Sequence, residues 1–254
     1  MNIFTPVQLV PDLVEELVVD AEGKRLDPDT IRWIVNEFDD HAIEQAILLK
    51  EQSGGKVTVL APDLEGADDV LFQAAAKGAD RLVKLAGDFE EGCNTHALAR
   101  RIAEFAQGER PDLILTGVHT HNSLDGALGP MLAALLGWPF VDCVAFTTVE
   151  NGKAVVRKEY PGGLVAEMEV SLPAVLGIQS ANTPPRYVPI SKIRLAMKSS
   201  RVDEEEAGEL DSSGEVGLSR MYAPEVVSRA EMIEGGVDEV AERLVALFKE
   251  LTVL

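Results

Sequence analysis

The polar side chains best suited to chemistry lie together in one stretch, residues 113–131. Residues 113–115 are apolar and, with Thr116, predict a buried strand that ends at Gly117. The loop that follows holds the polar side chains His119, His121, Asn122, Ser123 and Asp125. Small residues at 126–129 then lead into an apolar helix that runs to residue 136. A strand, a glycine-containing loop and a helix start present an anion site in open α/β sheets, although an ordinary strand-to-helix connection has the same pattern.

The same loop permits two other chemistries, which the spacing does not favour. His119, His121 and Asp125 could ligate a metal together with Cys143, but their spacing matches no established zinc pattern. Ser123 could be a nucleophile beside histidine, but the chain has no Gly-x-Ser-x-Gly turn. It also has no Walker lysine loop and no Gly-x-Gly-x-x-Gly fingerprint. We therefore assign no catalytic residue and no metal ligand.

Composition limits the kind of protein and its partners. The chain has 254 residues, of which 46% are hydrophobic and 26% charged, so it can build a sizeable core. The formal net charge of -20 argues against nucleic acid and anionic membranes as partners, because phosphates would be repelled. Cys93 and Cys143 show no paired spacing, which favours a reducing, cytoplasmic compartment. We see no signal peptide and no run long enough to span a bilayer, so no direct membrane insertion is expected.

Strand and helix patterns alternate through the first half of the chain. Strands are predicted at residues 2–10 (interrupted by Pro6), 56–61, 81–85 and 113–116, with a loose excursion at 15–25. Helices are predicted from a cap at Asn36 to a stop at Gly54, and at residues 66–77 and 95–106. This alternation predicts right-handed parallel crossovers. The expected fold class is α/β, with a doubly wound and mostly parallel sheet.

The second half predicts an antiparallel β extension and a C-terminal helical arm. Strands are expected at residues 140–149, 154–160, 164–170 and 174–179, with a hairpin turn at Asn151 and Gly152, and a short basic helix at 191–198. Residues 203–215 are acidic and read as a linker, and residues 236–251 form an amphipathic helix. Its apolar stripe must be buried on its own domain or, as we expect, on a partner chain. We divide the chain into residues 1–200 and 201–254.

Short motifs in a fixed order resemble the β subunit of the electron-transfer flavoproteins over roughly the full chain. The matching landmarks are Val-Pro-Asp at 10–12, Asn-Glu-Phe-Asp-Asp at 36–40, Lys-Gly-Ala-Asp-Arg at 77–81, Asp-Leu-Ile-Leu-Thr-Gly at 112–117, Gly129, Met-Leu-Ala at 131–133, Trp-Pro at 138–139, Gly-Gly-Leu at 162–164, Leu-Pro-Ala-Val at 172–175 and Pro-Arg-Tyr at 185–187. Each is short, but their order and spacing together are specific.

The resemblance implies a heterodimer in which an α subunit carries FAD and this chain binds a structural AMP. It implies an electron carrier, not an enzyme, that takes electrons from a dehydrogenase and passes them to an acceptor such as a quinone reductase. The implied cofactor-binding residues are Val10, Asn36, Glu37, Phe38, Asp39, Ala61, Gly117, Asn122, Asp125, Gly126, Ala127, Leu128 and Gly129. Leu13 and Phe38 match positions near the α-subunit flavin. The implied loop for recognising dehydrogenases is Asn182, Thr183, Pro184, Pro185, Arg186 and Tyr187, and residues 201–254 would be the linker and arm that hold the α subunit.

The chain departs from the family pattern in the nucleotide loop. Val118 stands where many members have lysine, and Asn122 stands for the first of three aspartates. Ala127 and Leu128 replace a Gln-Thr pair, so side-chain contacts to the phosphate are lost and the backbone donors of residues 126–129 remain. His119, His121 or Asn122 could compensate for the lost side chains. Pro130 after Gly129 is similar to bifurcating, NADH-dependent relatives with a second FAD in the β subunit. A bifurcating subunit and a non-redox nucleotide-binding module are therefore the alternatives.

Overall fold

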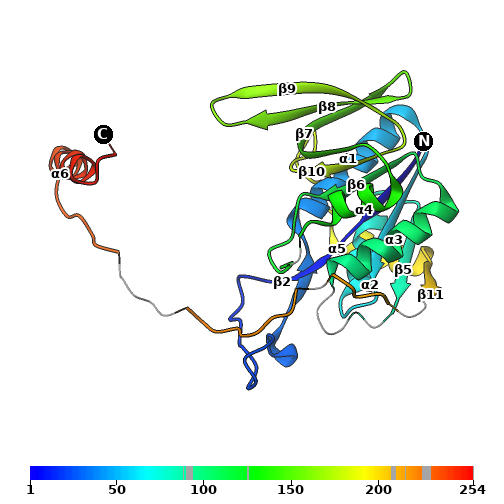
Figure 1. Ribbon diagram of the computed structural model, residues 1–254, viewed down its shortest axis with the longest axis horizontal. Coiled ribbons are helices and arrows are strands. Elements are labelled where there is room, and N and C mark those ends of the chain that lie inside the picture. The colour runs from blue at the N-terminus through cyan, green and yellow to red at the C-terminus, as the bar shows by residue number, and fades with distance from the viewer. Residues whose placement is uncertain are drawn as a thin grey trace.

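The computed structural model describes residues 1–87, 89, 94–124, 126–206, 210–214, 216–224 and 230–253. A nine-stranded sheet has the order β11-β5-β4-β1-β6-β10-β7-β8-β9 (Figure 1). Its strands are β1 (Asn2–Pro6), β4 (Lys56–Pro62), β5 (Arg81–Ala86), β6 (Leu113–Gly117), β7 (Phe140–Glu150), β8 (Lys153–Tyr160), β9 (Leu164–Ser171), β10 (Ala174–Ile178) and β11 (Val202–Glu206). The pairings from β11 to β7 are parallel, and β7, β8 and β9 pair antiparallel. The predicted α/β class with an antiparallel extension is confirmed.

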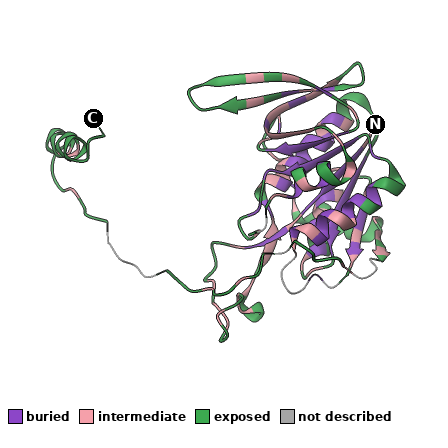
Figure 2. Cartoon of the chain, viewed as in Figure 1, coloured by how far each residue is buried: buried purple, intermediate pink, exposed green. Residues whose placement is uncertain are grey.

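Helices cover both faces of the sheet. The helices on the sheet are α1 (Glu37–Ser53), α2 (Ala67–Lys77), α3 (Thr95–Glu109) and α4 (Leu128–Leu136), whereas α5 (Ile190–Ser199) lies on α2 and α6 (Val237–Glu250) stands apart (Figure 1). Residues of α1 and α2 share one buried apolar cluster with alternate residues of the strands, and α5 packs on α2. Residues of α3 and α4 share a second cluster with the opposite strand faces. In Figure 2 the buried residues lie along the strands and on the sides of α1 to α4 that face the sheet.

The first predicted strand is wrong as a single element. β1 ends at Pro6, and residues Leu9–Pro11 form β2, which pairs antiparallel with β3 (Trp33–Val35) in a separate two-stranded sheet. Proline cannot donate to a ladder, so the chain leaves the large sheet at this point. The excursion that follows contains a bridge between Val19 and Leu26 and the short 3-10 helix η1 (Pro28–Thr30).

The acidic run at residue 203 begins as a strand and not as a linker. Residues Val202–Glu206 form β11, which extends the sheet beside β5. Its carboxylates are paired by neighbouring cations: Asp203 with Arg81 at 2.9 Å, and Glu204 with Lys84 at 3.4 Å. Cross-strand pairing removes the repulsion that a run of carboxylates would otherwise carry. Glu209 and Glu215 of the predicted linker lie outside the described residues.

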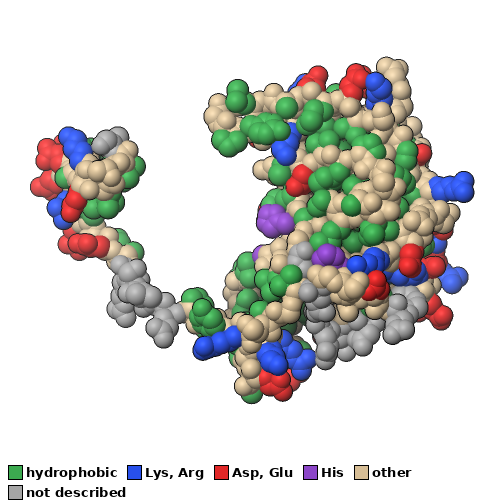
Figure 3. All heavy atoms as spheres, in the orientation of Figure 1, with side chains coloured by type: hydrophobic (Ala, Val, Ile, Leu, Met, Phe, Trp, Pro, Cys, Tyr) green, Lys and Arg blue, Asp and Glu red, His purple; other side chains and the backbone are tan. Residues whose placement is uncertain are grey.

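The hairpin and the C-terminal helix project from the body. Asn151 and Gly152 both have positive φ, 52° and 75°, as the predicted two-residue hairpin turn requires. Hydrophobic side chains gather at the far end of the β8–β9 hairpin, where Leu164 and Val165 are exposed (Figure 3). Helix α6 has no buried residue and stands apart from the sheet in Figure 1. Among the described residues, no helix has the length and apolar character needed to cross a membrane.

Candidate functional site

Asp39 ties together the carboxyl ends of β1 and β6. Its Oδ1 accepts the backbone N–H of Gly117 at 2.7 Å, and its Oδ2 accepts that of Gln8 at 2.8 Å. The side chain is buried, and burial raises the pKa of Asp39 to about 6, although both N–H donors favour the carboxylate. The first turn of α1 is therefore fixed against the strand ends where a doubly wound sheet binds its ligands.

Two glycines permit close packing at this edge. A Cβ on Gly117 would lie 2.6 Å from Asp39 Oδ1 and 2.7 Å from Phe38 Cβ. A Cβ on Gly129 would lie 2.8 Å from Thr116 Oγ1. Glycine is therefore required at both positions, because any larger residue would push α1 or α4 away from β6.

The loop after β6 is held by its neighbours. Asn36 Nδ2 donates to the carbonyl of His119 at 3.0 Å, so this side chain does not cap α1 as predicted, although α1 does begin at Glu37. His121 Nε2 lies 3.1 Å from the carbonyl oxygen of Pro11. The loop thus connects β2, α1 and β6.

Polar groups in this loop do not form a metal centre or a nucleophile in the described part of the chain. No cluster of three or more His, Cys, Asp or Glu residues that could hold a metal occurs among the described residues. Ser123 Oγ lies 2.6 Å from Thr120 Oγ1 and 3.3 Å from Thr95 Oγ1, so its partners among the described residues are hydroxyls and not an imidazole. Cys143 lies in β7, and burial raises the pKa of its thiol. Asp125 lies outside the described residues.

Helix α4 begins with buried donors that no side chain caps. Leu128 and Gly129 are its first two residues and are buried, and Ala127, at the N-cap position, makes no capping hydrogen bond. The first N–H groups of a helix have no partner within it and carry partial positive charge. Within the described part of the chain, Thr116 Oγ1, which faces Gly129, is also buried without a hydrogen-bond partner. This group of donors fits a phosphate or another oxygen-rich anion.

The other predicted binding residues are spread along the same edge. Val10 is buried in β2 opposite Ile34, and Ala61 is buried near the carboxyl end of β4. Glu37, Asn122 and Gly126 are exposed. The structure brings the Asn36–Asp39 turn against Gly117 and His119, whereas Val10 and Ala61 make no side-chain hydrogen bond or ion pair with the described residues of the loop.

The two residues predicted near a partner's flavin lie at the outer rim. Leu13 is 62% exposed. Phe38 is half-buried, and its ring centroid lies 5.0 Å from that of His119.

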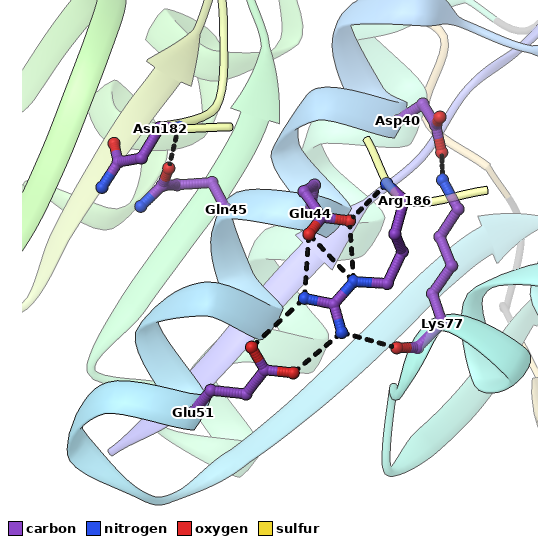
Figure 4. Close-up of polar contacts among 7 residues, drawn as sticks. All are labelled: Asp40, Glu44, Gln45, Glu51, Lys77, Asn182 and Arg186. Atoms are coloured by element: carbon purple, nitrogen blue, oxygen red, sulfur yellow. Dashed lines mark hydrogen bonds and ion pairs between the residues drawn. The ribbon is translucent and has the colours of Figure 1, made fainter. Parts of the chain in front are cut away.

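Side chains of the predicted recognition loop bind to other parts of the same chain, which the sequence did not indicate (Figure 4). Asn182 exchanges two side-chain hydrogen bonds with the backbone of Thr147, both 2.9 Å. Arg186 binds Glu44 at 2.9 Å and Glu51 at 2.8 Å, and these hydrogen bonds raise the pKa of the guanidinium. Arg186 is predicted to recognise a partner, but in the structure its guanidinium joins the loop to α1.

A cavity of about 330 Å³ lies elsewhere, between α3, the end of α4 and residues 210–211. Its lining includes Arg100, Arg101 and Leu135 and none of the predicted binding residues. Leu210 and Asp211 form one wall, and Asp211 pairs with Arg100 at 3.3 Å. The cavity is thus associated with the C-terminal segment and not with the strand ends.

The fold and this edge define an α/β protein of the class that holds ligands at the carboxyl ends of parallel strands. The sequence model described as "Electron transfer flavoprotein domain" matches residues 25–210. The "Electron transfer flavoprotein subunit beta" of Methylophilus methylotrophus is 32% identical, covering 98% of both chains, and that of Bacillus subtilis is 26% identical over 98% of both. The subunit from Syntrophomonas wolfei is 32% identical over 78% of both chains. The chain belongs to the electron transfer flavoprotein family, as a relative of its β subunits.

Proposed function

We propose that this chain pairs with an α subunit that carries FAD and that it binds a structural adenine nucleotide, AMP. The pair would accept electrons from a dehydrogenase and pass them to an acceptor such as a quinone reductase. FAD supplies the redox chemistry when it is bound, because a flavin takes up two electrons and releases them singly. This chain's own residues would orient the α subunit, hold the nucleotide and present the docking surface.

The observation that carries the nucleotide proposal is the uncapped, buried start of α4. Leu128, Gly129 and Met131 can offer N–H groups there, and Thr116 adds an unpaired hydroxyl. The chain lacks the lysine that many relatives place after Gly117, so backbone donors must supply the charge complementarity. A mononucleotide suits such a site, because its phosphate needs only local donors and not a cationic surface.

Ligand stoichiometry tests this proposal. The purified αβ heterodimer is denatured, and the released FAD and AMP are quantified per heterodimer. One FAD and one AMP are expected. Two FAD molecules per heterodimer would contradict the carrier proposal and favour the bifurcating alternative. A complex without flavin would contradict both the carrier and the bifurcating proposals.

A variant of Ala127 tests whether AMP binds at the start of α4. Aspartate at this N-cap position can cap the helix and also repel a phosphate, so Ala127→Asp is expected to lower bound AMP roughly tenfold while α4 remains folded. Pro189→Asp is the matched control, since it adds the same charge at the uncapped N-cap position of α5. Equal AMP content in the two variants and the unchanged heterodimer would place the nucleotide elsewhere.

The C-terminal helix is the proposed arm for the α subunit. Its apolar stripe includes Leu247 and Phe248, 38% and 40% exposed, and Leu251, 59% exposed. A chain ending at Glu234 is expected to bind the α subunit at least roughly tenfold more weakly, because this stripe loses its partner. Co-elution with the α subunit on size exclusion, and titration by calorimetry, measure the loss.

Point variants separate the stripe from the length of the arm. Leu244→Asp/Phe248→Asp places charge on the apolar stripe and should reproduce the truncation. Glu242→Ala/Lys249→Ala changes the exposed opposite face and should leave affinity unchanged. Undiminished binding by the stripe variant would show that α6 does not hold the α subunit.

A further inference from the structure

We propose that the start of α4 binds the nucleotide phosphate together with a divalent cation, Mg²⁺, which Asp142 of β7 and Thr116 of β6 help to hold. The inference rests on the proposed function, because the phosphate of the bound nucleotide completes the coordination of the cation. It adds to that function an ion and a ligand, Asp142, that the sequence did not indicate. The cation would supply the full positive charge of the lysine that Val118 replaces, which backbone donors carry only in part.

Thr116 and Gly177 lie side by side on the sheet face that α4 covers. In the strand order β6-β10-β7, Thr116 of β6 pairs in register with Gly177 of β10. Ile114 and Val175, two residues earlier on the same strands, belong to the apolar cluster shared with α3 and α4. Since side chains alternate along a strand, Thr116 and Gly177 face α4 as well.

Asp142 places a carboxylate above Gly177. A Cβ on Gly177 would collide with Oδ1 of Asp142, so glycine at this position makes room for the carboxylate. On the neighbouring strand, Thr116 Oγ1 faces Gly129, the second residue of α4. Adjacent strands are about 4.8 Å apart, so one ion can lie within reach of both side chains at the start of the helix.

Both oxygens lack a partner in the described part of the chain. There, Asp142 Oδ1 and Thr116 Oγ1 are buried and form no hydrogen bond, and Asp142 makes no ion pair. A buried oxygen in this situation has lost its water and gained no donor, which is costly, above all for a carboxylate. Two such oxygens on neighbouring strands therefore indicate a group that binds between them.

The charges at this place select a cation that binds with a phosphate. A phosphate at the uncapped N–H groups of α4 would lie close to the Asp142 carboxylate, and two anions repel each other strongly when they are shielded from water. A cation between them replaces this repulsion with attraction. Mg²⁺ prefers oxygen ligands and is commonly held by one or two carboxylates and the phosphates of a nucleotide, with a serine or threonine hydroxyl as a further ligand in some sites. Asp142, Thr116 and the phosphate supply this set.

The chain alone does not offer a complete metal site. Among the described residues, no group of three or more His, Cys, Asp or Glu side chains could hold an ion. One carboxylate and one hydroxyl are too few ligands for Mg²⁺ without the phosphate, so the cation and the nucleotide are expected to bind cooperatively. Each should then raise the affinity of the other by the same factor.

The test measures AMP binding to the αβ heterodimer with and without Mg²⁺. The heterodimer is freed of bound nucleotide, and its dissociation constant for labelled AMP is determined by equilibrium dialysis in Mg²⁺ or in EDTA. Mg²⁺ is expected to tighten AMP binding roughly tenfold. Asp142→Asn and Thr116→Val should lose most of this gain, and Thr116→Ser should keep it. In EDTA, Asp142→Asn should bind AMP more tightly than the unchanged chain, because the carboxylate no longer repels the phosphate.

Mn²⁺ detects the ion itself, because its paramagnetic resonance signal changes when it is bound. Mn²⁺ should bind the unchanged heterodimer when AMP is present, and Asp142→Asn should bind it much less. Thr147→Val is the matched control for Thr116→Val, since Thr147 Oγ1 is also buried and unpaired among the described residues but lies farther along β7. Asp112→Asn, beside the opposite end of β6, is the control for the carboxylate. Both controls should keep the full effect of Mg²⁺.

The outcomes separate failure of the inference from failure of the proposed function. An AMP affinity that is the same in Mg²⁺ and in EDTA would overturn the inference and leave the proposed function intact. A Mg²⁺ effect that persists in Asp142→Asn would also overturn it, because the ion would then bind elsewhere. Tighter AMP binding by Asp142→Asn in both solutions would mean that Asp142 only repels the phosphate, which likewise overturns the inference. A heterodimer that binds AMP in neither solution would contradict the proposed function itself.

Discussion

Replacing Arg186 with methionine is expected to lower the free energy of unfolding by about 3 kcal/mol. The reason is the environment of Glu44, whose side chain is only 2% exposed and whose carboxylate is paired by Arg186. Without the guanidinium, a buried charge is left uncompensated, and this costs more than the lost contact itself. Glu51, 53% exposed, can be solvated by water and adds little to the cost. Urea unfolding of the full chain, followed by tryptophan fluorescence, measures the change.

Two further variants test this explanation of the Arg186 effect. Arg157→Met breaks a pair of similar geometry with Glu167, 2.9 Å long, but both partners are more than half exposed, so it should cost less than about 1 kcal/mol. Glu44→Leu/Arg186→Met removes both buried charges and should be more stable than Arg186→Met alone. If the double variant were the less stable of the two, an unpaired Glu44 carboxylate could not be the cause.

The order of strands and helices could be predicted because periodicity reports burial directly. Strands with continuous apolar runs, such as residues 113–116, are buried on both faces of a parallel sheet. Gly54 and Gly78 end α1 and α2 as helix-stop signals predict. Local signals sufficed there, because each element is specified by its own residues.

The structure differs from the sequence predictions where contacts between distant residues decide the local conformation. β11 is acidic and has no strand-like pattern, and it forms because Arg81 and Lys84 of β5 lie beside it. Asn36 has the identity of a cap, but its side chain is taken by the carbonyl of His119 in another loop. Composition cannot show which of two partners a polar side chain will choose.

The sequence predicted where the candidate site lies but not the side chains that hold it in place. The sequence placed a helix start after Gly117 and drew attention to residues 182–187, and the structure adds the buried polar residues that fix both. Glu44 and Gln45 lie among the apolar residues of α1 and are buried, which a pattern of hydrophobic residues does not reveal. The one available signal was that this helix carries carboxylates among its apolar residues, while a distant loop carries a single cation that can pair with them.

Helix α1 connects the two regions in which binding residues are predicted. Its first turn carries Phe38 and Asp39 at the strand ends, and its later turns carry Glu44, Gln45 and Glu51 beside residues 182–187. The edge at the strand ends and the loop of residues 182–187 are therefore both fixed to one rigid element.

Asp39 gives the second large effect, a dependence of stability on pH. Its pKa is raised from 3.8 to about 6 by burial, so the folded state holds this proton more tightly than the unfolded state does. The resulting stabilisation is complete below about pH 4 and is lost as pH rises toward and through 6. This difference between the folded and unfolded pKa of Asp39 corresponds to about 3 kcal/mol of stability in total, of which roughly 1 kcal/mol should be lost between pH 5 and pH 7.

Asp39→Asn isolates this contribution, because asparagine does not titrate. The unfolding free energy of the unchanged chain minus that of the variant should fall from pH 5 to pH 7 and become level above about pH 7. Asp112→Asn is the matched control: Asp112 also accepts a backbone N–H, that of Asn2 at 2.7 Å, but at an exposed position where water solvates the carboxylate. Its difference curve should show no comparable fall. A curve for Asp39→Asn that rises over this range would mean that the hydrogen bonds from Gln8 and Gly117 outweigh burial and that the carboxylate stabilises the strand ends when it is charged.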